Sequence, residues 1–210
     1  MKKIFTKENL KKFFRTYIWL MVLLFIVDIA TKWAVVNHYG VAQMNASVHH
    51  FDPNVITIIK NFCYIGGAIN EKAAFSLGPN RIILLLISVV MTGAFIIYYA
   101  IEFKKMSTTT KVAFALMIAG GFGNLIDRAF YWPATTGFNG VVDWIIFVFW
   151  GHEFAMFNIA DSCLVIGIAI LVIEIIIEEI KNAIEKGKKG EYKYSPEELE
   201  KKKNAKHKSN

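Results

Sequence analysis

Four segments of this chain are apolar enough to cross a membrane as helices, and they constrain the fold more than any other feature. They are residues 17–36, 82–101, 112–126 and 154–177. Crossing the hydrocarbon core takes about 20 helical residues, and a shorter helix can cross among its neighbours. We therefore predict an all-α polytopic membrane protein, with four transmembrane helices in residues 17–177, a basic segment at 1–16 and a charged tail at 178–210.

The composition excludes an ordinary water-soluble domain. Of the 210 residues, 55% are hydrophobic and 20% are charged, and the mean hydropathy is +0.40. The first apolar segment is too long for a signal peptide and no small-residue cleavage site follows it, so we expect it to be retained as a span. Cys63 and Cys163 form no ligand-spaced cluster, so we expect packing residues and neither a disulfide nor a zinc site.

Lysine and arginine residues orient the predicted bundle. Six lie in residues 1–16, three in the link 102–111 and ten in residues 181–210, whereas residues 36–81 hold three and residues 128–153 hold one. Positive residues concentrate on the cytoplasmic side of membrane proteins, so we predict cytoplasmic termini, a cytoplasmic middle link and two long extracytoplasmic connections. The net charge of +7 fits contact with membrane lipids; without a binding motif it does not indicate nucleic acid.

The first outer connection has a strand pattern. Residues 55–65 are rich in β-branched and aromatic side chains, contain no proline and are followed by Gly66 and Gly67. Such a run predicts a strand followed by a turn, and we expect a small extracytoplasmic β-sheet on the membrane surface. The tail after Ile184 has many charges and few apolar residues, so we expect frayed helix or disorder there.

Polar residues in the first and third spans share helix faces. Asp28 and Lys32 are four residues apart, so they can neutralise one another, either as a pair that locks helices together or in direct chemistry. Asn124, Asp127 and Arg128 lie within one turn at the end of the third span. We expect a local ion pair between Asp127 and Arg128. Asn124 and Arg128 are candidate site residues, because they offer a donor and acceptor and a fork of donors.

Two aspartates lie close to the fourth apolar segment, one before it and one within it. Asp143 lies in the second outer connection, and Asp161 follows Asn158 by one helical turn. Two carboxylates held close together cannot both ionise cheaply, so one becomes an acid and the other a base that can activate water. Alternatively, Asp143 caps a re-entrant or interfacial segment at 144–150, and Asp161 is a satisfied polar residue. Spacing alone leaves both interpretations open.

Five short motifs occur in a fixed order: DIATKW at 28–33, NEKAAFS at 70–76, GNLIDR at 123–128, GVVD at 140–143 and FNIADS at 157–162. Each alone is weak, but together they resemble the motifs of the lipoprotein signal peptidases (signal peptidase II), polytopic aspartyl proteases of bacterial membranes. That family also has four spans with both ends inside. The resemblance covers residues 28–162.

The resemblance implies a substrate class and roles for particular residues. Members of the family cleave diacylglyceryl-modified prolipoproteins before the lipidated cysteine, on the extracytoplasmic side of the bacterial cell membrane, and their outer sheet forms a cradle around the substrate. Carried over by motif, Asp143 and Asp161 are the catalytic pair. The substrate-binding or supporting residues are Asn70, Asn124, Arg128, Asn158, Asp28 and Lys32.

The resemblance also implies the ligands and partners. Globomycin, a cyclic peptide antibiotic, occupies the catalytic site of this family, so we expect globomycin-type inhibitors to bind. We expect a monomer with no cofactor. A catalytic metal is not expected, because the candidate residues include no histidine or cysteine at ligand spacing.

The chain departs from the family pattern in two places. Lys72 stands where the family usually has glycine, which affects the backbone and the substrate contacts near Asn70. The loop at 129–142 is longer than expected and contains Trp132, Pro133 and glycines, so we expect an exposed loop at the membrane surface, a candidate lid.

Two functions of other classes compete with the peptidase. A small transporter would relay protons or ions through Asp28, Lys32 and Asp161, and would spread polar residues through the depth of several helices. Residues 82–101 contain almost none. A non-catalytic scaffold for lipoproteins would keep its function when either Asp143 or Asp161 is replaced.

Overall fold

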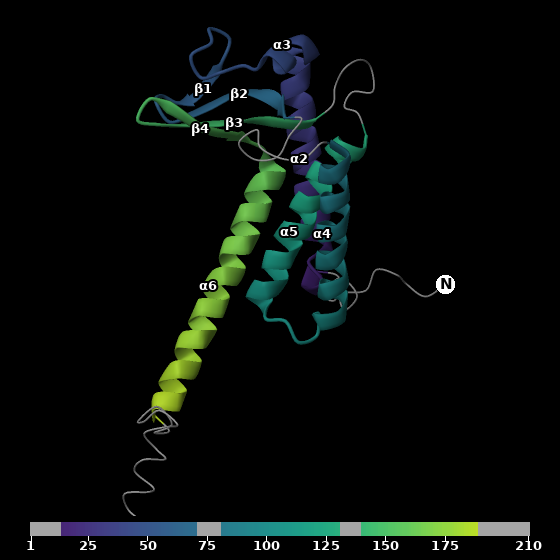
Figure 1. Ribbon diagram of the computed structural model, residues 1–210, viewed down its shortest axis with the longest axis vertical. Helices are drawn as coiled ribbons and strands as arrows, with labels where there is room; N and C mark the ends of the chain where they lie inside the picture. Colours follow the sequence, from purple (N-terminus) through teal and green to yellow (C-terminus); the bar gives the residue numbers. More distant parts are fainter. Residues whose placement is uncertain (1–13, 71–80, 131–139, 189–210) are drawn as a thin grey trace, which may run out of the picture. The chain divides into compact units, whose positions relative to one another are not determined.

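The computed structural model describes residues 14–70, 81–130 and 140–188, and it confirms four helices long and apolar enough to span a membrane (Figure 1). They are α2 (Ile18–Tyr39), α4 (Arg81–Glu102), α5 (Thr108–Ala129) and α6 (Ile159–Lys188). Many large apolar side chains of α2, α4 and α6 are exposed, as expected for helices surrounded by lipid. The chain is a multi-pass membrane protein.

The predictions on Lys72 and on residues 1–13 and 189–210 lie outside the described residues, as does most of the 129–142 loop. The chain divides into two compact units, one up to Ile170 and one from Leu171. In the described part, the second unit is the continuation of α6. All residues of the candidate site belong to the first unit.

Two helices start at positions that differ from the sequence prediction. α5 begins at Thr108 instead of residue 112, because the Ser107 hydroxyl oxygen caps it by accepting a hydrogen bond from the Thr110 N–H at 2.9 Å. α6 begins at Ile159 instead of residue 154, because the residues before it form a strand. The apolar composition of that strand made it look like part of the span.

The predicted sheet is confirmed, but its strands come from both long connections between spans. It has four antiparallel strands in sequence order, β1 (Ile56–Ile59), β2 (Cys63–Asn70), β3 (Val141–Phe149) and β4 (His152–Phe157). The prediction of one strand over 55–65 followed by a turn is wrong. The turn lies between β1 and β2, and the two glycines lie inside β2. Residues 144–150, considered as a re-entrant or interfacial segment, form most of β3 and the turn after it.

The sheet is anchored to the membrane helices by a small core. Its buried members, from α2, α3 (Val41–Ala46), the segment after α3 and β3, are Val35, Val36, Tyr39, Met44, Val48 and Val142. The Tyr39 hydroxyl donates to the Ile65 carbonyl oxygen of β2 at 2.7 Å. Val142 precedes Asp143, so this core fixes the position of β3 directly beside the candidate site. Of the four spanning helices, α5 is the most buried, and it contacts both α2 and α4.

Candidate active site

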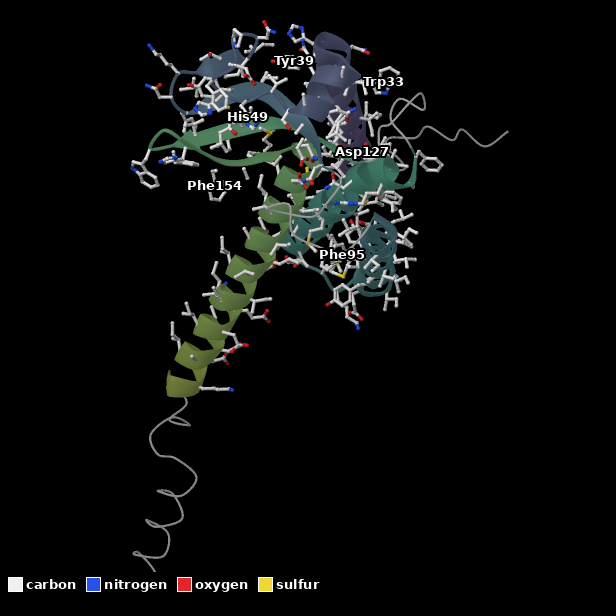
Figure 2. The ribbon with its side chains drawn as sticks, turned by 45° about the horizontal axis from the view of Figure 1, so that its top comes forward. Trp33, Tyr39, His49, Phe95, Asp127 and Phe154 are labelled. Atoms are coloured by element: carbon white, nitrogen blue, oxygen red, sulfur yellow. The ribbon has the colours of Figure 1, made fainter. Side chains whose placement is uncertain are left out.

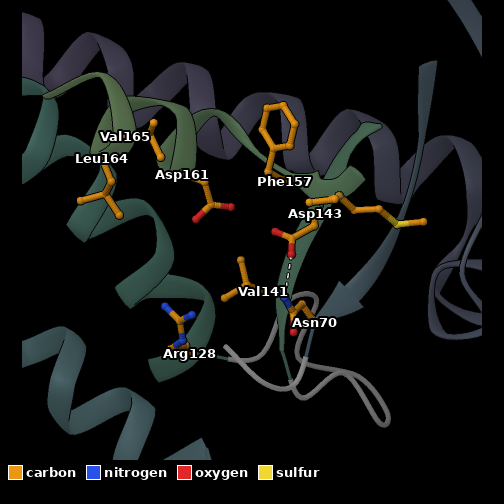
Figure 3. A pocket seen from close by; sticks show the side chains of 10 residues that line it. Asn70, Arg128, Val141, Asp143, Phe157, Asp161, Leu164 and Val165 are labelled. Atoms are coloured by element: carbon orange, nitrogen blue, oxygen red, sulfur yellow. Dashed lines mark hydrogen bonds between the residues drawn. The ribbon is translucent and has the colours of Figure 1, made fainter. Parts of the chain in front are cut away.

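Asp143 and Asp161 line one pocket where β2 and β3 meet α5 and α6 (Figure 3). Its volume is about 280 Å³. The lining residues are Asn70, Arg128, Val141, Asp143, Ala155, Met156, Phe157, Asp161, Leu164 and Val165. Four of the predicted site residues, taken from four separate motifs, therefore face the same cavity, with aliphatic and aromatic side chains completing its wall.

Strand β2 positions Asp143 through one side chain of β2 and through the β2 backbone. Asn70 Nδ2 donates to Asp143 Oδ2 at 2.9 Å. Gly67 lies so close to the Asp143 carbonyl oxygen that a Cβ atom would overlap it, and its φ of +128° suits glycine alone. The ladder register shifts between Ile65 and Ala68, which brings Ala68 opposite Asp143. Gly67 thus allows the bulge that sets which residue of β3 faces the pocket.

Asp161 is fixed at the start of α6 by a capping box. Asn158 Oδ1 accepts from the Asp161 N–H at 2.9 Å, and Asp161 Oδ2 accepts from the Asn158 N–H at 3.3 Å. Asp28 Oδ1, from α2, accepts from the Ala160 N–H at 2.8 Å. These side chains satisfy backbone donors that a helix start leaves unpaired. The positive end of the α6 dipole also favours a negative charge on Asp161.

Two buried asparagines connect the aspartates. Asn158 Nδ2 donates to Asp143 Oδ1 at 2.7 Å and to Asn124 Oδ1 at 3.2 Å. Asn124 Nδ2 donates to Asp161 Oδ1 at 2.7 Å. Each amide therefore uses both its donor and its acceptor end, which fixes its orientation. The two carboxylates are held in one continuous hydrogen-bond network.

A fully buried ion cluster around Lys32 supports this network. Lys32 Nζ lies 2.7 Å from Asp28 Oδ2 and 2.8 Å from Asp127 Oδ2, and it donates to Asn124 Oδ1 at 3.4 Å. The predicted neutralisation of Asp28 by Lys32 is confirmed. Gly123 leaves the space for this cluster, because a Cβ there would overlap Asp28 Oδ2. Lys32 contacts a carboxylate of α2 and one of α5, so the cluster ties these two helices together.

The expected local pair between Asp127 and Arg128 is replaced by longer-range contacts. Asp127 pairs with Lys32 and its Oδ2 accepts from the Val142 N–H at 3.3 Å, at the end of α5 next to the sheet (Figure 2). Arg128 lines the pocket, and its Nη1 donates to the Ser88 hydroxyl of α4 at 3.3 Å. Successive helix residues point about 100° apart, so the two side chains reach different partners.

The charge state of the pocket follows from burial. Burial raises the pKa of the Asp143 carboxyl to about 7, and the Asp161 carboxylate adds to the rise, while hydrogen bonds from Asn70 and Asn158 oppose it. Near neutral pH Asp143 therefore exists in comparable amounts as acid and as carboxylate. Asp161 accepts a backbone N–H and the Asn124 amide at a helix N-terminus, contacts that stabilise its carboxylate form.

An apolar groove of about 920 Å³ adjoins the pocket. Its lining residues, from β3, β4, their turn and α6, are Phe147, Phe149, Trp150, His152, Glu153, Phe154, Ala155, Phe157, Asp161, Ser162, Val165 and Ile166. Asp161 and Phe157 line both cavities. The groove thus begins at one of the paired carboxylates and continues along the β3–β4 hairpin.

The donor set fits acid–base chemistry. Within the described ranges, no group of three or more histidine, cysteine, aspartate or glutamate side chains is placed to hold a metal ion. Two carboxylates of unlike environment, a guanidinium and three amides can activate water and hold a peptide carbonyl. That the reaction needs no metal remains a prediction.

Comparison with known proteins gives a family and two similar structures. A sequence model described as signal peptidase (SPase) II matches residues 20–177, a range that contains every candidate site residue. A bacterial membrane enzyme solved by the in meso method at 2.3 Å resolution has a TM-score of 0.61 and 27% identity, over 78% of this chain and 89% of that chain. Another, at 1.9 Å, has a TM-score of 0.57 and 27% identity, over 76% of this chain and 92% of that chain.

Proposed function

This chain belongs to the signal peptidase II family of aspartic peptidases, which act on lipoproteins in membranes, and we propose that it cleaves diacylglyceryl-modified prolipoproteins. Cleavage occurs directly before the lipidated cysteine in this proposal, with Asp143 and Asp161 as the acid–base pair. The observation that carries this proposal is the network in which Asn158 and Asn124 bind both carboxylates. It holds them in one pocket although they come from a strand and a helix.

The environments of the two aspartates support a different role for each. In this proposal Asp143, with its raised pKa, is the proton donor when it is protonated, and Asp161, at the helix N-terminus, is the base. Asp161 takes a proton from water as the water oxygen bonds to the scissile carbonyl carbon, and Asp143 gives its proton to the carbonyl oxygen. The resulting diol collapses when the C–N bond breaks. The leaving nitrogen then receives the proton from Asp161, and a diol hydroxyl returns one to Asp143.

The remaining pocket residues bind the substrate in this proposal. Arg128 and Asn70 line the cavity beside the pair and offer donors to substrate carbonyl groups. Asn70 also keeps Asp143 in place. The apolar groove that starts at Asp161 has the chemistry to take the acyl chains of the diacylglyceryl group, since eight of its twelve lining residues are Phe, Trp, Ala, Val or Ile. The lipidated cysteine would then lie next to the pair.

A cleavage assay with a lipidated precursor tests the catalytic assignment. We expect Asp143→Asn and Asp161→Asn each to reduce turnover by at least about 10² to 10⁴, because an amide cannot cycle a proton. Glu178→Gln, at an exposed carboxylate of α6 outside the pocket, is the matched control and should cleave normally. Near wild-type turnover in either aspartate variant would remove that residue from catalysis.

The location of the site is a separate part of the proposal. The lysine and arginine distribution supports a site on the extracytoplasmic side of the bacterial cell membrane. In a background in which Cys63 and Cys163 are replaced, Asn54→Cys in the first outer connection should react with a membrane-impermeant thiol reagent in intact cells. Ser107→Cys, in the middle link, should react only after the membrane is opened. The reverse pattern would refute the orientation.

A further inference from the structure

The turn between β3 and β4 places a tryptophan where the backbone disfavours one. Trp150 has a φ of +52° and Gly151 a φ of +80°, and Trp150 is 95% exposed. Asparagine and glycine are the usual residues of such two-residue hairpin turns, because both tolerate positive φ, whereas a bulky side chain there is an outlier. Folding of the hairpin alone therefore does not explain this tryptophan.

Trp150 belongs to a cluster of exposed aromatic residues centred on Phe149. Its ring centroid lies 6.1 Å from that of Phe149, which lies 5.9 Å from Phe154 and 5.6 Å from Phe62, in the adjoining β1–β2 turn. Phe154 is 63% exposed (Figure 2). We call Phe62, Phe149, Trp150 and Phe154 the aromatic tip. Two neighbouring hairpins thus present one apolar surface at the same end of the sheet.

The aromatic tip is continuous with the exposed apolar face of α6. Phe149, Trp150 and Phe154 line the apolar groove together with Val165 and Ile166 of α6, which are 67% and 51% exposed. α6 is long and apolar enough to span a membrane, and these two residues lie in its first turns, near one end of the candidate span. Tryptophan and other aromatic residues are enriched at the membrane–water boundary, where an apolar ring reaches hydrocarbon and a polar edge reaches headgroups.

We propose that the aromatic tip is a membrane-interface anchor, which inserts Trp150 into the headgroup–acyl boundary of the bilayer that α6 spans. The sheet is then held at both ends, by the α2–α3 core at one and by lipid at the other. This contact sets the height of the groove and of the pocket above the hydrocarbon. It goes beyond the proposed peptidase activity and does not depend on it.

Spin labelling tests the depth of the tip. Trp150→Cys, in a background without Cys63 and Cys163, is labelled in vesicles of phosphatidylcholine and phosphatidylglycerol, and its collisions with oxygen and with a water-soluble nickel chelate are compared. Ile168→Cys on α6 is the lipid reference and Asn54→Cys the water reference. We expect the label at position 150 to collide more often with oxygen than with the nickel chelate, as the label at position 168 does. A preference for the chelate, as at 54, would overturn the proposal.

A second measurement keeps the native side chain. Lipids brominated near the headgroup end of the acyl chains should quench the tryptophan emission of the wild type more than that of Trp150→Asn, a variant whose asparagine suits the positive φ and should fold. Equal quenching would overturn the proposal. The proposal would also be overturned if the collision rates of the label at 150 depended on the protein-to-lipid ratio. Such a dependence would mean that the aromatic tip binds a second copy of the chain. Both measurements should give the same result in the Asp143→Asn variant, so they remain valid if the catalytic assignment fails.

Discussion

Replacing Asp143 by asparagine should stabilise the protein above neutral pH. The native pKa of about 7 lies about three units above the ordinary value of 3.8, so ionising this buried carboxyl opposes folding. The native state binds the proton more tightly than the unfolded state, and wild-type stability therefore falls as pH rises from about 4 to about 7. At pH 8 the full shift costs about 4 kcal/mol, at about 1.4 kcal/mol per unit. At pH 5 the cost is about 2 kcal/mol.

The asparagine variant avoids this cost but loses a hydrogen bond. Asp143 accepts from the amides of Asn70 and Asn158, and an asparagine offers only one acceptor, so one donor meets another donor. That mismatch costs about 1–3 kcal/mol at every pH. We therefore expect a net gain of about 2 kcal/mol at pH 8 and almost none at pH 5. The change of about 2–3 kcal/mol between the two pH values is independent of the mismatch.

The assay is unfolding in mixed detergent micelles, with the apparent free energy measured from pH 5 to pH 8. Glu153→Gln is a control of opposite sign. Burial alone would raise the pKa of Glu153, but hydrogen bonds from the His50 N–H and the His49 and His50 rings lower it, so its stabilising effect is present above its ordinary pKa and lost in acid. This variant should lose stability at neutral pH. A constant difference between Asp143→Asn and wild type across the range would refute the buried-charge reasoning.

Three further outcomes follow from the site. Gly67→Ala should destabilise the fold by more than about 2 kcal/mol and abolish cleavage. The added Cβ atom would overlap the Asp143 carbonyl oxygen, and the positive φ of this residue disfavours alanine. Thermal unfolding measures the first effect and the cleavage assay the second. Lys32→Met should cost about 3–5 kcal/mol in unfolding free energy, since it leaves the carboxylates of Asp28 and Asp127 buried together; a loss below 1 kcal/mol would mean that they are protonated. Chelators should leave cleavage intact, and loss of activity that one divalent ion restores would contradict the metal-free mechanism.

The spans were predictable from the sequence because lipid imposes a length and a composition on each of them. The sheet was harder to predict. In β3 the successive residues Val141, Val142 and Asp143 are all buried. The strand therefore lacks the alternation of apolar and polar residues that is typical of a strand with one solvent-exposed face. β4 is apolar and runs directly into α6, and hydropathy alone does not separate the two. The two consecutive glycines of β2 predict a turn from composition, but in the structure they lie at a β-bulge within the strand.

Side-chain pairing in the site could be predicted only within one helix. Asp28 and Lys32 are four residues apart, and their contact follows from helix geometry. For Asp127, the adjacent Arg128 is the obvious partner in sequence, yet Lys32 lies 95 positions away and is fully buried. A buried ammonium must find anions wherever the fold supplies them, because its desolvation costs several kcal/mol. Nothing in the sequence indicates Ser88, 40 positions away, as a partner of Arg128.

The buried polar network also explains why the site needs three membrane helices to hold two carboxylates. The proposed acid–base pair can work only when its members keep their separation, and one lies on a strand and the other on a helix. Asp28 of α2 caps α6 at Ala160, and Lys32 ties α2 to Asp127 of α5, whose carboxylate binds the Val142 N–H next to Asp143. The connection from Asp161 to Asp143 therefore runs through α2 and α5 as well as through Asn158. A closed path of this kind resists shear between sheet and helices, which a single asparagine bridge would not.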